Sequence, residues 1–471
     1  MLIYGLIGAA GLVLLAWLWR GDRDPLLYLV PASLAFPPIL AYAGKGLAWP
    51  TGRASTRAAL AGCILLFGLF RLVRGEFGYL PIRGIRFLAP YLGLVALSVL
   101  WSVVGRYNGD VGAIANEFLS WLLPVAVFLL LAGSRRSNDD AGRAARVLLM
   151  TILGIALYSF LQGLALLGYN RAVPSAVAEL TQFGRDDLWW GSFRLYGTLP
   201  NLGPNVMGVF LTIPVLICWA RIAATKRVAR AGWAVGGLVG AAVILATFSR
   251  GAMLALLIGA LVIPVWSQSG RATAWVALSA CVVVVALAET PVGRSAASVY
   301  TEGQLDRDAT ARVYLWKAIW RELPQYPFGR GFNGWLRASR TSLDVGLADQ
   351  PAAIGSPHPA ENQWMREVAD RGVLGVVALA GLLVGLVTIC ARGAASARHE
   401  SDRFFLIGAG AAFVGWAVAM LTGDELMYDT SAGMFWYVAG IAVSLVNTAS
   451  DNRPDGINPE ATGTRLATLE G

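Results

Sequence analysis

Long apolar stretches that are almost free of ionisable side chains extend from residue 2 to about residue 447. A helix needs about 20 mostly apolar residues to cross a membrane, and the hydropathy of this chain predicts about thirteen such segments. They are residues 2–19, 26–43, 58–73, 86–104, 116–133, 145–169, 204–224, 232–248, 251–267, 273–289, 372–391, 404–423 and 433–447. The runs are continuous, whereas the strands of a membrane barrel alternate between apolar and polar residues. The pattern therefore predicts an all-α polytopic membrane protein with about 12–13 transmembrane helices.

One polar interval, from about Pro291 to Arg371, interrupts the apolar stretches and predicts a large helical loop outside the membrane. We therefore expect residues 1–290 to form a transmembrane bundle with short loops and one longer exterior loop at 170–203. Residues 291–371 are expected to form the large loop, and residues 372–447 the C-terminal transmembrane helices. Residues 448–471 are a short polar tail.

Composition excludes a soluble globular domain, because a chain that is 56% hydrophobic and 14% charged cannot hide so much apolar surface from water. The net charge of +9 gathers in short loops near residues 74–86, 135–146, 226–230 and 392–403. By the positive-inside rule these loops and the tail are cytoplasmic, which leaves the large loop outside. One loop, with Lys45, Arg53 and Arg57, disagrees with this count. The charge indicates orientation and contact with anionic lipid, not nucleic acid.

The first helical pattern in the large loop starts at Asp308, a favourable cap, and ends at Pro324. At about 100° per residue, one face carries an apolar stripe of Val313, Trp316, Ile319, Trp320 and Leu323. Such a helix is expected to lie along the membrane surface. Arg312 projects onto the same face, where its guanidinium either snorkels to water or meets an anion.

A second helical pattern runs from Pro359 to Asp370 and continues into the next apolar span. Its apolar stripe consists of Trp364, Met365 and Val368, and Glu361 falls in the middle of that stripe. A carboxylate on a packed face is either paired with a cation or held for acid–base chemistry. Glu361 is therefore a candidate general base or a structural partner of an arginine. His358, one of two histidines in the chain, precedes this helix and is a second candidate base.

Several arginines are expected on the exterior side of the membrane, namely Arg194, Arg250, Arg312 and Arg330. An arginine at the end of a span is often an interfacial anchor. As a group, however, these guanidiniums suit a pyrophosphate, because arginine offers planar bidentate donors to phosphate. No group of His, Cys or acidic residues has the spacing of metal ligands, so we expect no metal site and no cofactor.

These motifs follow a definite order. Arg194, Gly197 and Pro204-Asn205 lead into one span, Ser249-Arg250-Gly251 begins the next, and Arg312, Pro327-Phe-Gly-Arg-Gly331 and Asn362 follow in the large loop. In this order, and with this number of helices, the sequence resembles the O-antigen ligase and O-antigen polymerase superfamily of bacterial envelope enzymes. The resemblance in motifs covers about residues 190–380.

The resemblance implies a GT-C-like glycosyltransferase, independent of metal and inverting, in the bacterial inner membrane with its active site facing the periplasm. Its donor would be an undecaprenyl-diphosphate-linked glycan, and its acceptor a glycan or lipid A-core. Membrane lipid, a flippase and a chain-length regulator are the other implied partners. Arg250 and Arg312 would contact the diphosphate, and Arg194, Asn205, Arg330 and Asn362 would help to bind the substrates.

This chain departs from the ligases at one position, because ligases carry a histidine immediately before the asparagine that corresponds to Asn362. Glu361 stands there instead, and His358 lies three residues earlier, so either side chain could be the base. The departure favours a polymerase of lipid-linked repeat units over a ligase. A transporter or flippase for lipid-linked sugars is a third interpretation, but transporters usually keep ionisable residues within their spans.

Overall fold

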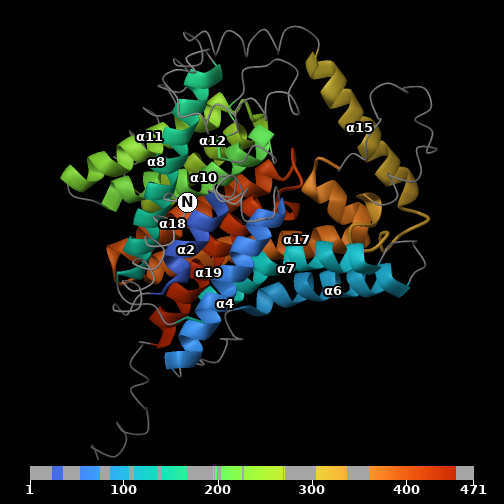
Figure 1. Cartoon of the computed structure of the whole chain (residues 1–471), viewed down its shortest axis with the longest axis horizontal. Helices are drawn as coiled ribbons and strands as arrows, with labels where there is room; N and C mark the ends of the chain where they lie inside the picture. Colours follow the sequence, from blue (N-terminus) through green and yellow to red (C-terminus); the bar gives the residue numbers. More distant parts are fainter. Residues whose placement is uncertain are drawn as a thin grey trace, which may run out of the picture.

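The computed structural model describes residues 24–35, 53–74, 85–104, 111–134, 139–166, 195, 197–198, 203–224, 227–268, 270, 304–336 and 360–451. In this part of the chain every regular element is a helix (Figure 1). The elements are α2 (Leu26–Ala35), α4 (Arg53–Arg74), η1 (Arg86–Leu88), α6 (Ala89–Val104), α7 (Val111–Ala132), α8 (Asp140–Leu166), α10 (Gly203–Ala224), α11 (Arg227–Ala246), α12 (Arg250–Ser267), α15 (Gln304–Glu322), α17 (Gln363–Ser396), α18 (Glu400–Ala419), η3 (Glu425–Met427) and α19 (Asp429–Asp451).

Within the described residues, nine helical segments are long and apolar enough to cross a membrane, from Arg86–Val104 to Asp429–Thr448. They coincide with nine of the predicted spans, so the prediction of an all-α polytopic membrane protein is confirmed. The predicted span 58–73 falls on α4, a helix with arginines at both ends, and the described part of 26–43 is the ten-residue helix α2. Predicted spans 2–19 and 273–289 lie outside the described residues.

Three helices form the centre of the bundle. The most apolar window of α10 and of α19 is 94% buried, and that of α18 is 72% buried, against 28–50% for the other candidate spans. Helix α18 packs against α10, α12 and α17, while α19 packs against α7. Aromatic rings fill the contact, as where Trp416 stacks on Phe435 at 4.7 Å between ring centroids. In the described part of the chain, side chains therefore fill the centre of the bundle.

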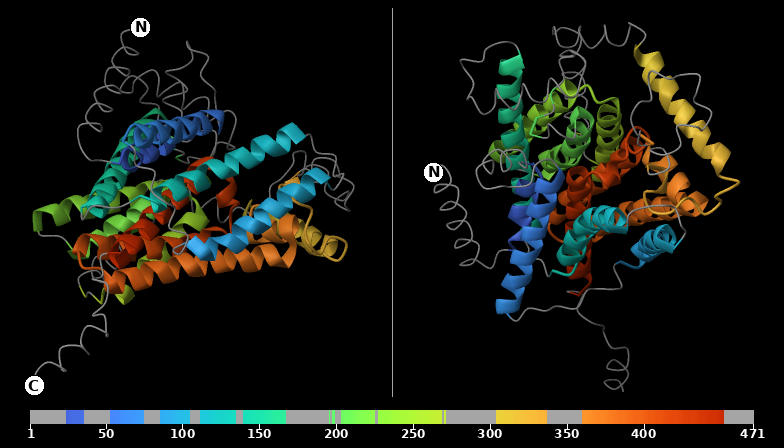
Figure 2. Two further views of the ribbon diagram at one scale, coloured as in Figure 1. Left: turned by 90° about the horizontal axis from the view of Figure 1, so that it is seen from below. Right: turned by 45° about the vertical axis from the view of Figure 1, so that its right-hand side comes forward.

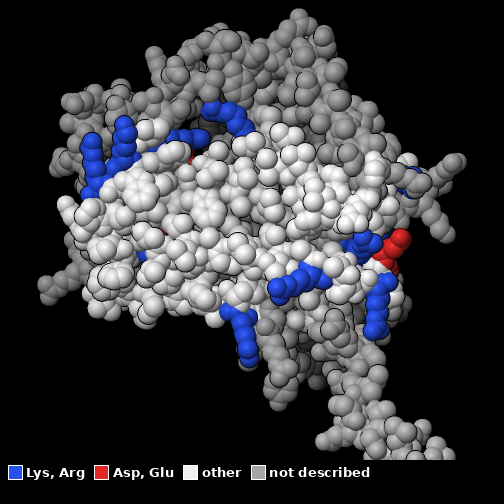
Figure 3. Space-filling view, turned by 180° about the vertical axis from the view of Figure 1, so that it is seen from behind, with Lys and Arg blue, Asp and Glu red and all other residues white. Residues whose placement is uncertain are grey.

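The outer helices present apolar side chains outwards. Exposed examples are Leu97, Leu100 and Val104 of α6, Met150, Leu157 and Phe160 of α8, Leu261 and Val265 of α12, and Val377 and Val384 of α17. Figure 3 shows a wide uncharged area on one face, with lysine and arginine side chains towards its margins. An apolar surface of this extent is stable against lipid tails and unfavourable in water.

The helices run alongside one another, so the bundle has two ends, and α15 lies at one end beside the start of α17 (Figure 2). Many of the described arginines lie at the other end, namely Arg143, Arg146, Arg221, Arg230, Arg392, Arg398 and Arg403. Arg57 of α4 lies at the α15 end, where its Nε donates to Asp429 Oδ2 at 3.0 Å. Arg57 is one of the three basic residues that disagreed with the positive-inside rule. The ion pair explains its position, because Asp429 neutralises the positive charge of Arg57.

Helix α17 crosses the predicted boundary between the large loop and the last spans. It is kinked at Gly372, whose φ of 66° and ψ of −164° lie in a region that only glycine adopts readily. A Cβ at Gly372 would lie 2.1 Å from the carbonyl oxygen of Pro327. Gly329, with a φ of 75°, is equally close to the backbone of Asp370 and Arg371. The segment from Pro327 to Gly331 thus packs backbone to backbone against the kink.

We expect Gly372→Ala to lower the thermal unfolding midpoint of the detergent-solubilised protein, because strained backbone alone costs about 1–3 kcal/mol and the Cβ meets a carbonyl oxygen. Gly381→Ala in the same helix is the matched control, since a Cβ there meets nothing within 4 Å. Equal midpoints for the two variants would contradict the assigned role of the kink.

Candidate active site

The N-terminal end of α17 brings two of the predicted site residues into contact. Arg312, in the middle of α15, donates from Nε to Glu361 Oε2 at 2.6 Å, and the two side chains are 23% and 37% exposed. One turn along α15, Trp316 Nε1 donates to the carbonyl oxygen of Ala360 at 3.1 Å. The sequence left open whether the Arg312 guanidinium extends to water or meets an anion. In the structure it meets an anion, the carboxylate of Glu361. This bond also gives Glu361 an arginine partner.

The sequence pattern predicted that Glu361 lies on the apolar face of a helix, and this prediction is wrong. It precedes α17 and has a φ of 48°, an unusual value for a residue with a side chain. Asn362 is the N-cap, with an extended backbone, and its Oδ1 accepts from Met365 N at 3.1 Å. The helix begins at Gln363 and not at Pro359, because the asparagine cap supplies an acceptor for a terminal N–H. The cap holds the backbone of Glu361 outside the helix.

The face of α15 that packs agrees with the predicted stripe in part, because Ile319 is buried and Trp316 and Leu323 pack against the same cluster. Leu315, Ala318 and Ile319 are buried, whereas Val313 and Trp320 are 41% and 52% exposed. The buried residues cluster with Val368 of α17 and with its neighbours Trp335, Ala360 and Ala369. Helix α15 also begins at Gln304, one turn before Asp308. Contact with α17 decides the buried face, and that contact is not encoded in the periodicity of α15 alone.

Charged side chains that the sequence analysis did not single out are buried beside this site. Arg366 lies between Asp424 and Asp370: its Nη1 donates to Asp424 Oδ2 at 3.0 Å, and its Nε is 3.4 Å from Asp370 Oδ2. Asp424 Oδ1 also accepts from Asn362 N at 3.0 Å. All three charged side chains are 5% exposed or less, so the charges stabilise one another in place of water. We call Asp370, Arg366 and Asp424 the buried triad.

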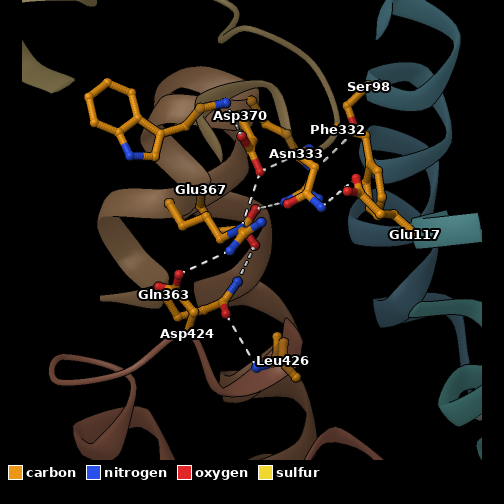
Figure 4. A network of polar contacts seen from close by, with 12 residues as sticks. Ser98, Glu117, Phe332, Asn333, Gln363, Glu367, Asp370, Asp424 and Leu426 are labelled. Atoms are coloured by element: carbon orange, nitrogen blue, oxygen red, sulfur yellow. Dashed lines mark hydrogen bonds and ion pairs between the residues drawn. The ribbon is translucent and has the colours of Figure 1, made fainter. Parts of the chain in front are cut away.

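The buried triad connects three segments of the chain. Asp370 accepts from Asn333 N and Trp335 N, both at 3.2 Å, and so holds the segment after Gly331. Asn333 in turn donates from Nδ2 to Glu117 of α7 at 2.6 Å. Figure 4 shows Asp370 on α17 facing Asn333 on one side, and Asp424, from the turn between α18 and α19, near Gln363 at the start of α17. Carboxylates therefore fix the turn of α18–α19, the start of α17 and the 331–335 segment relative to one another.

A second buried ion pair lies on the same helix. Glu367 and Arg371 are in contact one turn apart, and Tyr91 of α6 donates from its hydroxyl to Glu367 Oε1 at 3.1 Å. Gln363 Nε2 donates to the same oxygen at 2.9 Å. Arg371 Nε donates to Ser98 Oγ at 3.3 Å. These bonds fasten the first part of α17 to α6. The run of charges in residues 366–371 is the signal from which the sequence could have indicated this cluster.

Glu425 is a buried acid in the turn between α18 and α19. It is 2% exposed, and its Oε2 finds no hydrogen-bond partner among the described residues. Burial, with a smaller contribution from the negative charge of Asp424, raises the pKa of Glu425 to about 8. Burial also raises the pKa of Asp424, although Arg366 opposes this shift. Glu425 is therefore protonated at neutral pH and adds no second negative charge to the turn.

The remaining predicted site residues are distributed over the same end of the bundle. Arg250 is exposed at the first residue of α12, after the N-cap Ser249, and its neighbour Gly251 lies directly against Thr422 of the α18–α19 turn. Asn205 is half-buried in the first turn of α10. Arg330 forms an ion pair with Glu322, with 2.8 Å between Arg330 Nε and Glu322 Oε2, and does not contribute to the Arg312–Glu361 pair. Arg194 and His358 lie outside the described residues.

A comparison with known protein families identifies this part of the chain. Residues 235–380 match the family described as O-antigen ligase. The match extends from α11 to the first half of α17, and it includes Arg250, Arg312, Arg330 and the Glu361-Asn362 pair. No curated protein matches the chain.

We expect the stability of the solubilised protein to fall as the pH rises from about 5 to about 8. The folded state holds a proton on Glu425 up to about pH 8, whereas an unfolded glutamate releases it near its ordinary pKa of 4.5. The folded state thus binds more protons between these values, and stability declines with pH there. Glu425→Gln should flatten this decline in the thermal midpoint. Glu400→Gln, at an exposed position at the other end of the bundle, should leave it unchanged.

Proposed function

Because this chain belongs to the O-antigen ligase and O-antigen polymerase superfamily, we propose that it is a membrane glycosyltransferase that polymerises lipid-linked oligosaccharide repeat units. The donor is a glycan on undecaprenyl diphosphate, and the product is an exported polysaccharide such as an O-antigen, a capsule or an exopolysaccharide. The contact between Arg312 and Glu361 is the observation that supports this most, since it joins a phosphate-binding group to a candidate base.

The proposed reaction is a direct displacement at the anomeric carbon, with inversion. A sugar hydroxyl of the acceptor loses its proton to Glu361 or His358 and forms the new bond to that carbon. The bond from the carbon to the diphosphate breaks, and undecaprenyl diphosphate leaves with the electron pair. Arg312 and Arg250, helped by Arg194, stabilise the negative charge that develops on this leaving group. Arginines take the role that a divalent cation has in other phosphate-releasing enzymes, so the proposed mechanism needs no metal.

The ion pair suggests how donor binding prepares the base. Arg312 Nε donates to Glu361 Oε2 at 2.6 Å, and a phosphate oxygen bound by Arg312 would accept from the same N–H. A diphosphate bound by Arg312 competes with this carboxylate and releases Glu361 for the acceptor hydroxyl. The positive φ of Glu361 keeps its side chain outside the helix during the exchange. Donor binding is therefore expected to precede proton transfer.

The arrangement of charge supports an orientation. Arg143, Arg146, Arg221, Arg230, Arg392, Arg398 and Arg403 lie at the end of the bundle opposite the Arg312–Glu361 pair. The positive-inside rule assigns that far end to the cytoplasm. In a bacterial inner membrane the proposed active site then faces the periplasm, where polymerisation would use lipid-linked units already carried across by a flippase.

We expect Arg312→Ala and Glu361→Gln to separate donor binding from transfer. Arg312→Ala should weaken binding of undecaprenyl diphosphate and reduce chain growth by roughly 100-fold or more. Glu361→Gln should bind undecaprenyl diphosphate at least as tightly as the wild type, because a competing carboxylate is gone, while chain growth falls roughly 100-fold or more. Arg321→Ala, an exposed arginine on the same helix, is the control with unchanged activity. Normal chain growth by Glu361→Gln would assign the base to His358.

The second candidate is an O-antigen ligase that transfers finished glycan to lipid A-core or protein, and the matched family's description favours it. Glu361, in place of the ligase histidine, favours the polymerase. Deleting the gene distinguishes them by the glycans that accumulate on undecaprenyl diphosphate. We expect single repeat units in the deletion strain; long unligated chains would show a ligase. Lipid-linked units lengthened by the purified protein would exclude a flippase.

A further inference from the structure

An apolar surface faces outwards on α15 and on the segment that follows it. Trp320 and Phe328 are 52% and 71% exposed, and Val313 is 41% exposed. Val313 and Trp320 are seven residues apart, which places them within about 20° of each other around the helix axis. We call Val313, Trp320 and Phe328 the outer face. Single exposed apolar residues are common on protein surfaces, but large side chains that gather on one side indicate a contact.

The outer face coincides only in part with the stripe that the periodicity of α15 predicted for the membrane surface. Trp316, Ile319 and Leu323 of that stripe pack in the cluster between α15 and α17. Val313 and Trp320 remain outside this cluster, and Phe328 follows the helix and was not part of the stripe. Packing against α17 therefore leaves a smaller and different apolar surface exposed.

Phe328 lies where the apolar surface of α17 begins. A Cβ at the kink residue Gly372 would lie 3.1 Å from the Cα of Phe328. The next two residues of α17, Val373 and Leu374, are exposed, and they belong to a candidate membrane span. An exposed phenylalanine thus adjoins the outward side of a helix that is apolar enough to lie in lipid.

The same segment also borders α6, a second candidate span. The N–H of Phe332 donates to the carbonyl oxygen of Ser98 at 3.0 Å, and Ser102 Oγ donates to the carbonyl oxygen of Phe332 at 3.2 Å. Trp101 and Val104, in the last turn of α6, are exposed. The outer face is therefore next to the lipid-facing surfaces of two spans at this end of the bundle.

Basic side chains accompany the outer face. Lys317 and Arg321 are exposed and lie within about 100° of Val313 around the helix axis. Of the described side chains from 312 to 328, no acidic one is exposed, since Glu322 is half-buried beside Arg330. Helix α15 runs obliquely to α6 and α7 (Figure 1). Helices that lie in a membrane interface combine apolar and aromatic residues on one side with basic residues that meet lipid phosphates.

We propose that the outer face is a lipid-contact surface. Val313, Trp320 and Phe328 insert at the boundary between acyl chains and headgroups, and Lys317 and Arg321 meet headgroup phosphates. The partner is the phospholipid of the leaflet at the α15 end of the bundle. This contact goes beyond the proposed function and needs no substrate. For the proposed glycosyltransferase, it also places Arg312 at the level of the donor's diphosphate, and this consequence alone rests on the proposed function.

The test places nitroxide spin labels on the full-length protein in vesicles of phosphatidylethanolamine and phosphatidylglycerol. The four native cysteines are first changed to alanine, and Trp320→Cys or Phe328→Cys then supplies one labelling site. Collision of the label with oxygen, which concentrates among acyl chains, is compared with collision with a water-soluble nickel chelate. Val377→Cys, exposed on α17, is the reference for lipid, and Glu400→Cys, exposed at the other end of the bundle, is the reference for water.

We expect the oxygen-to-nickel collision ratio at both outer-face positions to rise above that of the Glu400 reference towards that of Val377. A ratio equal to the Glu400 value would place the surface in water and overturn the proposal. Low collision with both reagents would show that protein covers the surface, for example a second copy of the chain, and would also overturn it. Because no substrate is present, neither result bears on the proposed function.

A second measurement decides if the cysteine-free protein does not fold. In vesicles that contain brominated phospholipid, bromine quenches the fluorescence of tryptophans that touch acyl chains. Trp320→Phe, with the native cysteines kept, should reduce the quenched part of the fluorescence relative to the wild type. Trp416→Phe, which removes a fully buried tryptophan, should leave the quenched part unchanged. Equal quenched parts for Trp320→Phe and the wild type would overturn the lipid contact.

Discussion

The geometry at the end of the bundle depends on Arg366, a buried cation held between two buried carboxylates. A charge in a protein interior is unfavourable unless it is paired and hydrogen-bonded. Asp424 accepts a hydrogen bond from Arg366 Nη1, Asp370 lies 3.4 Å from Arg366 Nε as a second ion-pair partner, and the two aspartates come from different parts of the chain. The pairing is favourable only when α17, the α18–α19 turn and the 331–335 segment are all in place. Backbone N–H groups also donate to Asp370 Oδ1, Asp370 Oδ2 and Asp424 Oδ1, so each carboxylate oxygen of the two aspartates has at least one partner.

This constraint makes one side of the candidate site rigid. Asn362 is fixed twice, as the cap of α17 and through its N–H to Asp424, and Glu361 is attached directly to it. Helix α15, which carries Arg312, is held differently, by a small apolar cluster and two side-chain bonds to residues 360–361. Glu361, the proposed base, is thus adjacent to a hydrogen-bonded helix cap, whereas α15, with the proposed phosphate-binding Arg312, has fewer contacts that hold it in place. An exchange of Glu361 for a diphosphate at Arg312 is compatible with this difference.

The segment from Gly329 to Trp335 is held by the same architecture. The segment with Arg330 and Trp335 is fixed because its N–H groups bond to Ala369 and Asp370 of α17. Gly329 and Gly372 permit that approach, since a Cβ on either would enter the opposing backbone. One helix, α17, therefore supports the Glu361 end of the site and the 329–335 segment, and it continues into a candidate membrane span.

The sequence by itself determined the helical membrane fold, because lipid requires long apolar segments and each such segment is visible without knowledge of its neighbours. It also indicated Arg312, Glu361 and Asn362 as residues of interest, through a charge on an apolar face and an order of motifs. It assigned Glu361 to a helix, and it identified neither the Arg330–Glu322 ion pair nor the buried triad. Only the tertiary structure decided these points. An N-cap, an ion pair and a buried charge each depend on which residues of distant segments come within a few ångströms, and no local periodicity contains that information.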